Sequence, residues 1–428
     1  MRIFVIGLFV LFYPLSQAAE KAAPLPEPLT LEYALSLADE VTPEMEFIQA
    51  DILQAEAGVK DAEALSGFNS LLEMRAGYVD PSALSPNQNN DDHRVGIIAS
   101  KSLYDFGRSH AAENSAQQLL SSNKFNYLDA RQRRRVEIMQ RYFDVVLADL
   151  QFYRYNEEMA VVFIDMDRSR NRKELGQAAD IDVLEKEVTY QRIRHLRYKS
   201  QNEQRRTRAL LAQALNRPDT LSDTLATPTL KSLKRKLDEV EKYQELAMLN
   251  NTSLKSLHAE VAGLEQSLIQ ARSSNNPRLT GKLEAYSYSR ELASSDNFRA
   301  GLTLEIPLWT GGRSDAEQAR AQAALFRARA KIRKSELDIK QAVLELWLEL
   351  DALRINREEM LTAADYQELY LDRSRALYEM EVKTDLGDSM VRVSEAERNL
   401  RDVEFRIELG WEKLNALLGD VTTAMTNE

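Results

Sequence analysis

The sequence of 428 residues contains no cysteine, so disulfide bonds, thiolate metal sites and a lipidated N-terminal cysteine are all excluded. Its four histidines are scattered without the spacing of a zinc site. We find no phosphate-binding loop, nucleophile elbow or carboxylate pair in a cleft-forming context, and we therefore expect neither an enzyme nor a cofactor. The formal net charge of −11 argues against nucleic acid as a partner, because its phosphates would repel the chain.

Long apolar runs are also missing once the N-terminal segment is passed. Arg2, the apolar run 3–15 and the small residues 16–18 predict a secretory signal peptide over residues 1–18. The alternative is a membrane anchor, but the run is too short to span a bilayer. Because no later stretch is long and apolar enough for a membrane helix, an exported chain of this kind would have to enter a membrane with strands.

Glycine and proline are absent from residue 108 to residue 173. At 1.5 Å per residue, this stretch is long enough for a helix of roughly 100 Å. Apolar residues within it recur at intervals of four and three, the spacing of a coiled coil, at Met139, Phe143, Val146, Leu150 and Tyr153. The basic run at Arg131, Arg133, Arg134 and Arg135 is interpreted as a solvated helix face rather than an anion site.

The chain contains one unit written twice. The motif LYDFGR at 103–108 recurs as LWTGGR at 308–313, and each copy ends an alternating run, passes a glycine and opens a long helix. We therefore predict strand-to-helix corners at Gly107, Arg108, Gly312 and Arg313. The predicted organisation is a signal peptide at 1–18, a first repeat at 19–217, a connector at 218–236, a second repeat at 237–419 and a tail at 420–428.

Each repeat is expected to contain a helix, a β-hairpin, a long helix and a further helix. The first predicted helix runs from about 30 to 67 with a kink at Pro43, and its counterpart runs from about 238 to 273. The remaining predicted elements are strands at 69–79, 94–105, 278–290 and 297–309, long helices at 108–173 and 313–381, and final helices at 182–216 and 389–418.

The second strand of the second repeat alternates most clearly. Six apolar residues face one way, at Phe298, Ala300, Leu302, Leu304, Ile306 and Leu308, and polar residues or glycine alternate with them. This pattern matches a barrel strand with lipid on one face and a lumen on the other, or a soluble sheet with one face on a core. Four strands cannot close a barrel, so in a membrane several chains must contribute: two would give eight strands, and three would give twelve with a hollow.

In this order and duplicated, these motifs resemble the TolC-like outer-membrane efflux proteins. The likeness rests on the two corners, the ALSLADEVTPEM start at Ala34, the ELGQAADIDVL turn and the helix ends ALLAQALN and KLNALLG. It implies a mainly α fold with transmembrane β-strands: a duplicated long-helix α-barrel joined to a trimeric 12-stranded β-barrel in the Gram-negative outer membrane. It also implies a passive export duct of a tripartite efflux or type I secretion system, gated at its periplasmic tip. The implied partners are outer-membrane lipid, a periplasmic adaptor and an inner-membrane transporter of ABC or RND type.

The resemblance also implies gate residues at the helix tips. Asp385 and Asp388 fall on acidic-ring positions, while Asp182, Tyr378 and Lys383 fall on or near positions that link neighbouring coils. The blander interpretation of the two acids is a solvated helix start, where carboxylates are favoured. The rival functions are a periplasmic adaptor with one coiled-coil hairpin and a soluble coiled-coil scaffold. The chain contains two copies of the repeat, each with strands whose pattern is typical of lipid-facing strands, and this argues against both rival functions.

Overall fold

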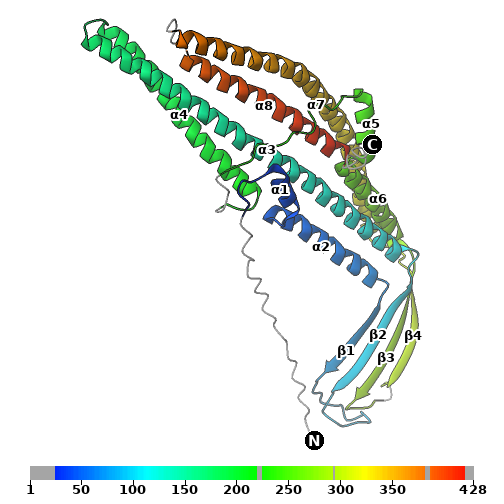
Figure 1. Ribbon diagram of the computed structural model, residues 1–428. Coiled ribbons are helices and arrows are strands. Elements are labelled where there is room, and N and C mark those ends of the chain that lie inside the picture. The colour runs from blue at the N-terminus through cyan, green and yellow to red at the C-terminus, as the bar shows by residue number, and fades with distance from the viewer. Residues whose placement is uncertain (1–24, 219–223, 293–294, 381–385, 420–428) are drawn as a thin grey trace.

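A computed structural model describes residues 25–218, 224–292, 295–380 and 386–419 (Figure 1). A four-stranded sheet stands at one end of a long body of helices, and two helical hairpins form the other end (Figure 1). The predicted signal peptide and C-terminal tail lie outside the described residues, as does part of the connector. Among the described helices, none combines the length and apolarity that crossing a membrane requires.

Two helices run the full length of the body. They are α3, Arg108–Glu174, and α7, Arg313–Glu379, with 67 residues each. Both begin directly after a corner glycine, as the sequence predicted, and at 1.5 Å per residue each spans roughly 100 Å. Of the predicted coiled-coil stripe in α3, Met139 and Phe143 are buried, but Tyr153 is 61% exposed.

Shorter helices stack end to end beside the long ones. Helices α2, Pro43–Ala64, and α4, Asp180–Ala214, pack along the two halves of α3. Helices α6, Thr252–Arg272, and α8, Leu386–Leu418, pack against both α3 and α7. The chain therefore forms a curved wall with α2 and α4 at one edge and α7 at the other (Figure 1).

The first helix of each repeat is broken rather than continuous, so the predicted kink at Pro43 is wrong. Helix α1, Leu31–Ser36, and the 3-10 turn Leu37–Asp39 end before Pro43. Thr42 then caps a new helix, its hydroxyl accepting a hydrogen bond of 3.3 Å from the Met45 amide. In the second repeat, α5, Val240–Asn250, is separated from α6 by Asn251, whose side chain accepts from the Leu254 amide at 2.9 Å.

The hydrophobic cores lie around these breaks. In one core the rings of Phe143 and Phe405 stack with centroids 4.4 Å apart, which joins α3 to α8. In the other, Trp411 is buried beside Tyr243, with the Arg235 guanidinium 4.1 Å from its ring centroid. Each repeat therefore has its own core, and the stacking of Phe143 on Phe405 joins the first core to the second repeat.

The basic run of α3 contributes to this middle region. Three of its members are exposed, as the interpretation as a solvated face predicts, and only Arg134 departs from it. Arg134 is buried and donates to the Glu40 carbonyl, while Arg135 pairs with Glu412 at 2.6 Å. The carboxylate of Glu40 also accepts from buried Arg217 at 2.7 Å. These contacts tie the start of α2 and the end of α4 to α3, which is where the two shorter helices meet.

Tyr142 provides a test of this core through its buried hydroxyl, which lies 2.8 Å from the Leu29 carbonyl oxygen and 2.5 Å from that of Ala226. Burial raises the pKa of Tyr142 to about 12 from its ordinary value near 10. The unfolded chain therefore loses this proton first, and stability that is fully present below pH 10 is lost as pH rises to 12. Two pKa units correspond to about 3 kcal/mol per chain.

Replacing Tyr142 by phenylalanine should lower stability at neutral pH by about 1–3 kcal/mol, because the one hydroxyl hydrogen that the Leu29 and Ala226 carbonyls share is lost. The variant should also lack the part of the stability loss between pH 10 and pH 12 that the ionisation of Tyr142 causes. Urea unfolding followed by circular dichroism between pH 8 and pH 12 measures both effects. An identical pH dependence in the wild type and the variant would contradict the assignment.

The strands are β1, Phe68–Arg75; β2, Arg94–Tyr104; β3, Arg278–Tyr288; and β4, Phe298–Glu305. They form one antiparallel sheet in the order β1-β2-β3-β4, so the two predicted hairpins pair with each other through β2 and β3. Strand β4 ends four residues earlier than predicted, and β1 stops at Arg75, followed by an isolated bridge between Tyr78 and Asp91. Pro307 has no amide hydrogen for a ladder, which agrees with the early end of β4.

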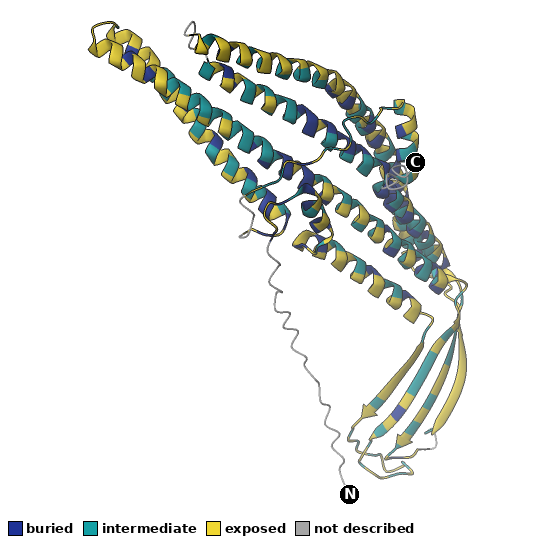
Figure 2. Cartoon of the chain, viewed as in Figure 1, coloured by how far each residue is buried: buried dark blue, intermediate teal, exposed yellow. Residues whose placement is uncertain are grey.

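The sheet has no core of its own. Every residue of β4 is exposed, and within the four described strands Gly96 alone is buried (Figure 2). No described helix covers either face of the sheet (Figure 1). Such a sheet is not the half-buried sheet of a soluble domain.

Candidate functional site

The two faces of the sheet differ in chemistry. The strand register places on one face a nearly continuous apolar set: Phe68, Leu72, Met74, Val95, Ile97, Ala99, Leu279, Leu283, Ala285, Phe298, Ala300, Leu302 and Leu304. We call this the apolar face. The opposite face, here the polar face, carries Asn69, Glu73, Arg75, Arg94, Ser100, Ser102, Arg278, Thr280, Lys282, Glu284, Tyr286, Tyr288, Arg299, Thr303 and Glu305. The alternation predicted from the sequence is therefore confirmed on β3 and β4. On β1 and β2 it has exceptions, since Leu71 and Ile98 lie on the polar face and Ser70 and Lys101 on the apolar face.

Charged side chains on the polar face pair across the strands. Arg94 of β2 pairs with Glu73 of β1. Glu284 of β3 lies 2.5 Å from the ammonium of Lys282 on the same strand and 3.8 Å from the guanidinium of Arg299 on β4. Such a ladder suits a water-filled space and not a lipid-facing surface.

Gly96 is the point of closest approach on the polar face. The Tyr286 ring lies over it, so an added Cβ would stand 2.0 Å from a ring carbon. The Arg94 guanidinium lies 5.5 Å from the centroid of the same ring. A glycine covered by a cross-strand aromatic ring pins the register of β2 against β3.

Both edges of the sheet are open, because β1 and β4 each pair on one side. The edges of the helical wall are also unfinished. Exposed apolar residues on α7 recur at intervals of 11, 11, 7, 11 and 3 residues: Phe326, Leu337, Leu348, Ile355, Tyr366 and Leu369. With 3.6 residues per turn these positions fall on one side of the helix, nearly opposite the residues that α7 buries against α6 and α8. We call this set the α7 stripe.

Helix α4, at the other edge of the wall, carries a similar stripe. Its exposed members are Ile181, Leu184, Val188 and Tyr198, and its buried members, among them Ile193 and Leu211, lie on the other side of the helix. One chain thus presents two different unfinished edges, on α4 and α7 and on β1 and β4. Edges of this kind are completed when copies join head to tail in a closed ring.

The predicted corners join sheet to helices through left-handed backbone. Phe106 and Gly107 have φ of 56° and 84° in the first copy, and Gly311 and Gly312 have 61° and 79° in the second. Arg108 and Arg313 are then the first residues of α3 and α7. In the first copy the Asp105 carboxylate accepts from the Ser109 amide at 2.8 Å and thereby caps the helix.

Replacing Gly312 by alanine should destabilise the corner by about 1–2 kcal/mol per subunit, because an L residue is strained at positive φ. The cause would be backbone strain alone, since an added Cβ meets nothing within 4 Å. The matched control is Gly301→Ala, which also adds a Cβ in open space but does not have a positive φ. The thermal midpoint should fall in the first variant and not in the second; equal midpoints would contradict the argument.

The tip between α3 and α4 is closed by backbone hydrogen bonds. Gly176, with φ 69°, donates to the Lys173 carbonyl at 2.8 Å, and Gln177 donates to the Arg172 carbonyl at 2.8 Å, which forms a Schellman motif. Asp182 accepts from the Ala179 amide at 3.1 Å and so stabilises the start of α4. Within this chain, therefore, Asp182 has a capping role that the sequence interpretation missed.

The other predicted gate residues lie near the second tip. Tyr378 is in the last turn of α7 and is 49% exposed, and Asp388 is exposed in the first turn of α8. Lys383 and Asp385 lie outside the described residues. Helix α8 begins at Leu386, three residues earlier than predicted, so Asp388 belongs to the helix.

Contacts just behind the tips were not predicted. Gly387 packs against Val161 of α3 so closely that an added Cβ would stand 2.8 Å from a Val161 methyl. The Ser394 hydroxyl donates to Glu157 at 2.5 Å, which also joins α8 to α3. The only sequence feature that points to these contacts is Gly387 at the start of a helix, and a glycine at that position is equally typical of a turn.

Comparison with known proteins agrees with this geometry. Residues 244–420 match the family model described as Outer membrane efflux protein. The outer membrane protein TolC of Vibrio cholerae is 23% identical over 393 residues, which cover 86% of this chain and 87% of TolC.

Two solved structures share the fold at low identity. The CmeC outer membrane channel of Campylobacter jejuni has a TM-score of 0.75 at 11% identity and covers 95% of this chain and 90% of its own. The outer membrane protein VceC of V. cholerae has a TM-score of 0.73 at 16% identity, with coverage of 91% and 96%.

Proposed function

We propose that this chain is a member of the outer membrane efflux protein family, whose model matches residues 244–420, and that it is the passive exit duct of a tripartite efflux or type I secretion system. The observation that carries the proposal is the four-stranded sheet, apolar on one face, charged on the other and open at both edges. Channels of this family are homotrimers, so twelve strands would close one barrel. The apolar face would then meet lipid and the polar face would line the duct.

The helical wall supports a continuous tube. Three copies joined through the α7 stripe and the α4 stripe would prolong the barrel by roughly 100 Å. A periplasmic adaptor and an inner-membrane transporter of ABC or RND type would meet it at the helix tips. A periplasmic adaptor function is favoured by no observation here. The division into repeats at 19–217 and 237–419 around the connector 218–236 remains our proposal for the domains.

Two measurements test this function: the oligomeric state of the protein extracted from outer membranes, and its conductance in a planar bilayer. Detergent extraction of outer membranes should yield heat-modifiable trimers, and these should conduct ions in planar bilayers. A soluble monomer without conductance would refute the proposal. The duct itself supplies no energy, so conductance should not require a nucleotide.

We also propose that the tips gate the duct. Asp385 and Asp388 would form an acidic ring of six carboxylates in a trimer, with Asp182, Tyr378 and Lys383 linking neighbouring coils. Carboxylates around one aperture attract cations. The exposed position of Asp388 at the start of α8 supports this arrangement.

Replacing Asp385 and Asp388 by alanine should therefore weaken block by a trivalent cation about tenfold or more, because the ring loses its charge. Single-channel recording with the cation on the tip side measures the half-blocking concentration. The control is Asp372→Ala, on the exposed surface of α7, which should leave block within about twofold. Unchanged block in the double variant would count against the ring.

A further inference from the structure

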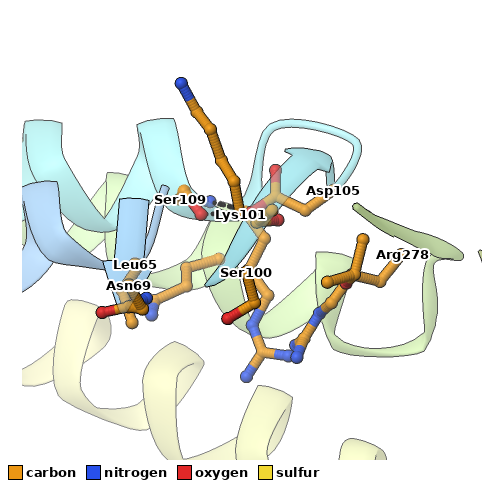
Figure 3. A pocket seen from close by; sticks show the side chains of 11 residues that line it. Leu65, Asn69, Ser100, Lys101, Asp105, Ser109 and Arg278 are labelled. Atoms are coloured by element: carbon orange, nitrogen blue, oxygen red, sulfur yellow. Dashed lines mark hydrogen bonds between the residues drawn. The ribbon is translucent and has the colours of Figure 1, made fainter. Parts of the chain in front are cut away.

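A small cavity of about 310 Å³ lies where the sheet meets the helices (Figure 3). Polar-face residues of three strands line it, among them Asn69 of β1, Ser100 of β2 and Thr280 of β3. Two basic side chains, Arg108 and Arg278, also line it; the backbone of Lys101 borders it as well, but the strand register places the Lys101 side chain on the apolar face. The cavity thus combines hydroxyl and amide donors with cationic groups, which is the chemistry that binds a multivalent anion.

The positive charge of the cavity is not neutralised by ion pairs. Across the described ranges, no carboxylate lies within ion-pair distance of Arg108 or Arg278. Asp105 also lines the cavity and contributes one negative charge, and its carboxylate accepts hydrogen bonds from the amide and hydroxyl of Ser109. The two guanidinium groups outnumber this single carboxylate. Glu305 is the cross-strand neighbour of Arg278 without forming an ion pair with it.

The second copy of the motif shows what a neutralised corner contains. Arg313, the counterpart of Arg108, pairs with Glu317 at 3.2 Å. Buried Ala112 stands in the first copy where Glu317 stands in the second, and Ser100 stands where Glu305 does. The first copy therefore lacks these two acidic groups, although it has Asp105 where the second copy has Thr310. Arg108, unlike Arg313, forms no ion pair within the part of the chain that the structure describes.

The polar face as a whole has the same sign. Within strand bounds it carries five basic residues, Arg75, Arg94, Arg278, Lys282 and Arg299, against three acidic ones, Glu73, Glu284 and Glu305. The complete chain, in contrast, has a net charge of −11. Within an acidic protein, this face would attract anions toward the cavity.

We propose that this cavity is an anion-binding site, which takes phosphate-bearing or similarly multivalent anions inside the duct. The proposal rests on the proposed function in one respect, namely that the polar face lines the duct. In a trimer the cavity would occur three times at one level, where the barrel meets the helical tube. An anion that enters from the helical side would meet this ring before the barrel.

Calorimetric titration of the detergent-purified trimer with tripolyphosphate tests the site directly. The wild type should bind, and added salt should weaken binding because the attraction is ionic. The variant with Arg108→Gln and Arg278→Gln should bind at least tenfold more weakly, and the single variant Arg278→Gln should be intermediate. The matched control Arg313→Gln removes the same charge from the other corner and should bind within about twofold of the wild type.

Equal affinity in the wild type and the double variant, or equal weakening in Arg313→Gln, would overturn the site. Migration as a heat-modifiable trimer verifies that each variant has folded. A second arm presents phosphatidylglycerol in nanodiscs without free phosphate; if this lipid alone were bound, the site in the duct would be refuted. Because titration needs no conductance, a trimer that binds but does not conduct would refute the duct function and leave the cavity standing.

Discussion

Replacing Leu302 by arginine should prevent stable insertion of the protein into the outer membrane. Leu302 lies in the middle of β4 on the apolar face and is 71% exposed in the single chain. An arginine that faces lipid near the bilayer midplane costs about 2–4 kcal/mol, or about 6–12 kcal/mol for three subunits. A penalty of that size is comparable to the whole stability of a typical domain.

The control is the next residue on the same strand. Thr303 points to the polar face, where Arg299 and Lys282 already stand, so Thr303→Arg should insert normally. Outer-membrane fractionation and heat-modifiability on gels measure both variants. Normal insertion of Leu302→Arg, or equal failure of the two, would show that the faces of the sheet are assigned the wrong way round or that the sheet does not meet lipid.

Placing glutamate at both Leu337 and Leu348 should stop trimer assembly while leaving the chain folded. Both residues belong to the α7 stripe, more than half exposed and turned away from the helices that α7 packs against. In a ring they would be buried against the next subunit, where each unpaired charge costs several kcal/mol. With two such charges at each of three interfaces, assembly should fail.

Asp338 supplies the control for this variant, because it is exposed on α7 and lies about 100° around the helix from Leu337, outside the stripe. Asp338→Lys also changes the charge of α7 and should assemble like the wild type. Analytical ultracentrifugation in detergent distinguishes monomer from trimer, and circular dichroism verifies that helix content is retained. A trimer that formed from the double variant would remove the α7 stripe from the interface.

Much of the fold could be predicted because the signals were local. Alternation along residues 298–305 predicted an exposed two-faced strand, and the glycine of each corner predicted where a long helix begins. The break at Asn251 was missed, since an asparagine without a proline is a weak signal inside an apolar pattern. Pro43 was noticed but interpreted as a kink, although Thr42 before it is a good helix cap.

The site residues were harder to predict because they depend on contacts between distant segments. Arg108 and Arg278 meet at one cavity through the pairing of β2 with β3, which joins the two repeats. The α7 stripe escaped notice because its members are spread over many turns and alternate with residues buried on the other side. Asp182 was assigned a link to another chain from resemblance alone, whereas its geometry in this chain is that of a helix cap.

The open sheet has a genetic consequence. The outer strands β1 and β4 of each chain are left to pair with neighbouring copies. One defective subunit therefore leaves the barrel incomplete even when the other two subunits are wild type. In a cell that makes equal amounts of wild-type and assembly-competent but insertion-defective chains, random mixing leaves only about one ring in eight fully sound. Faulty alleles of this protein would thus act dominantly.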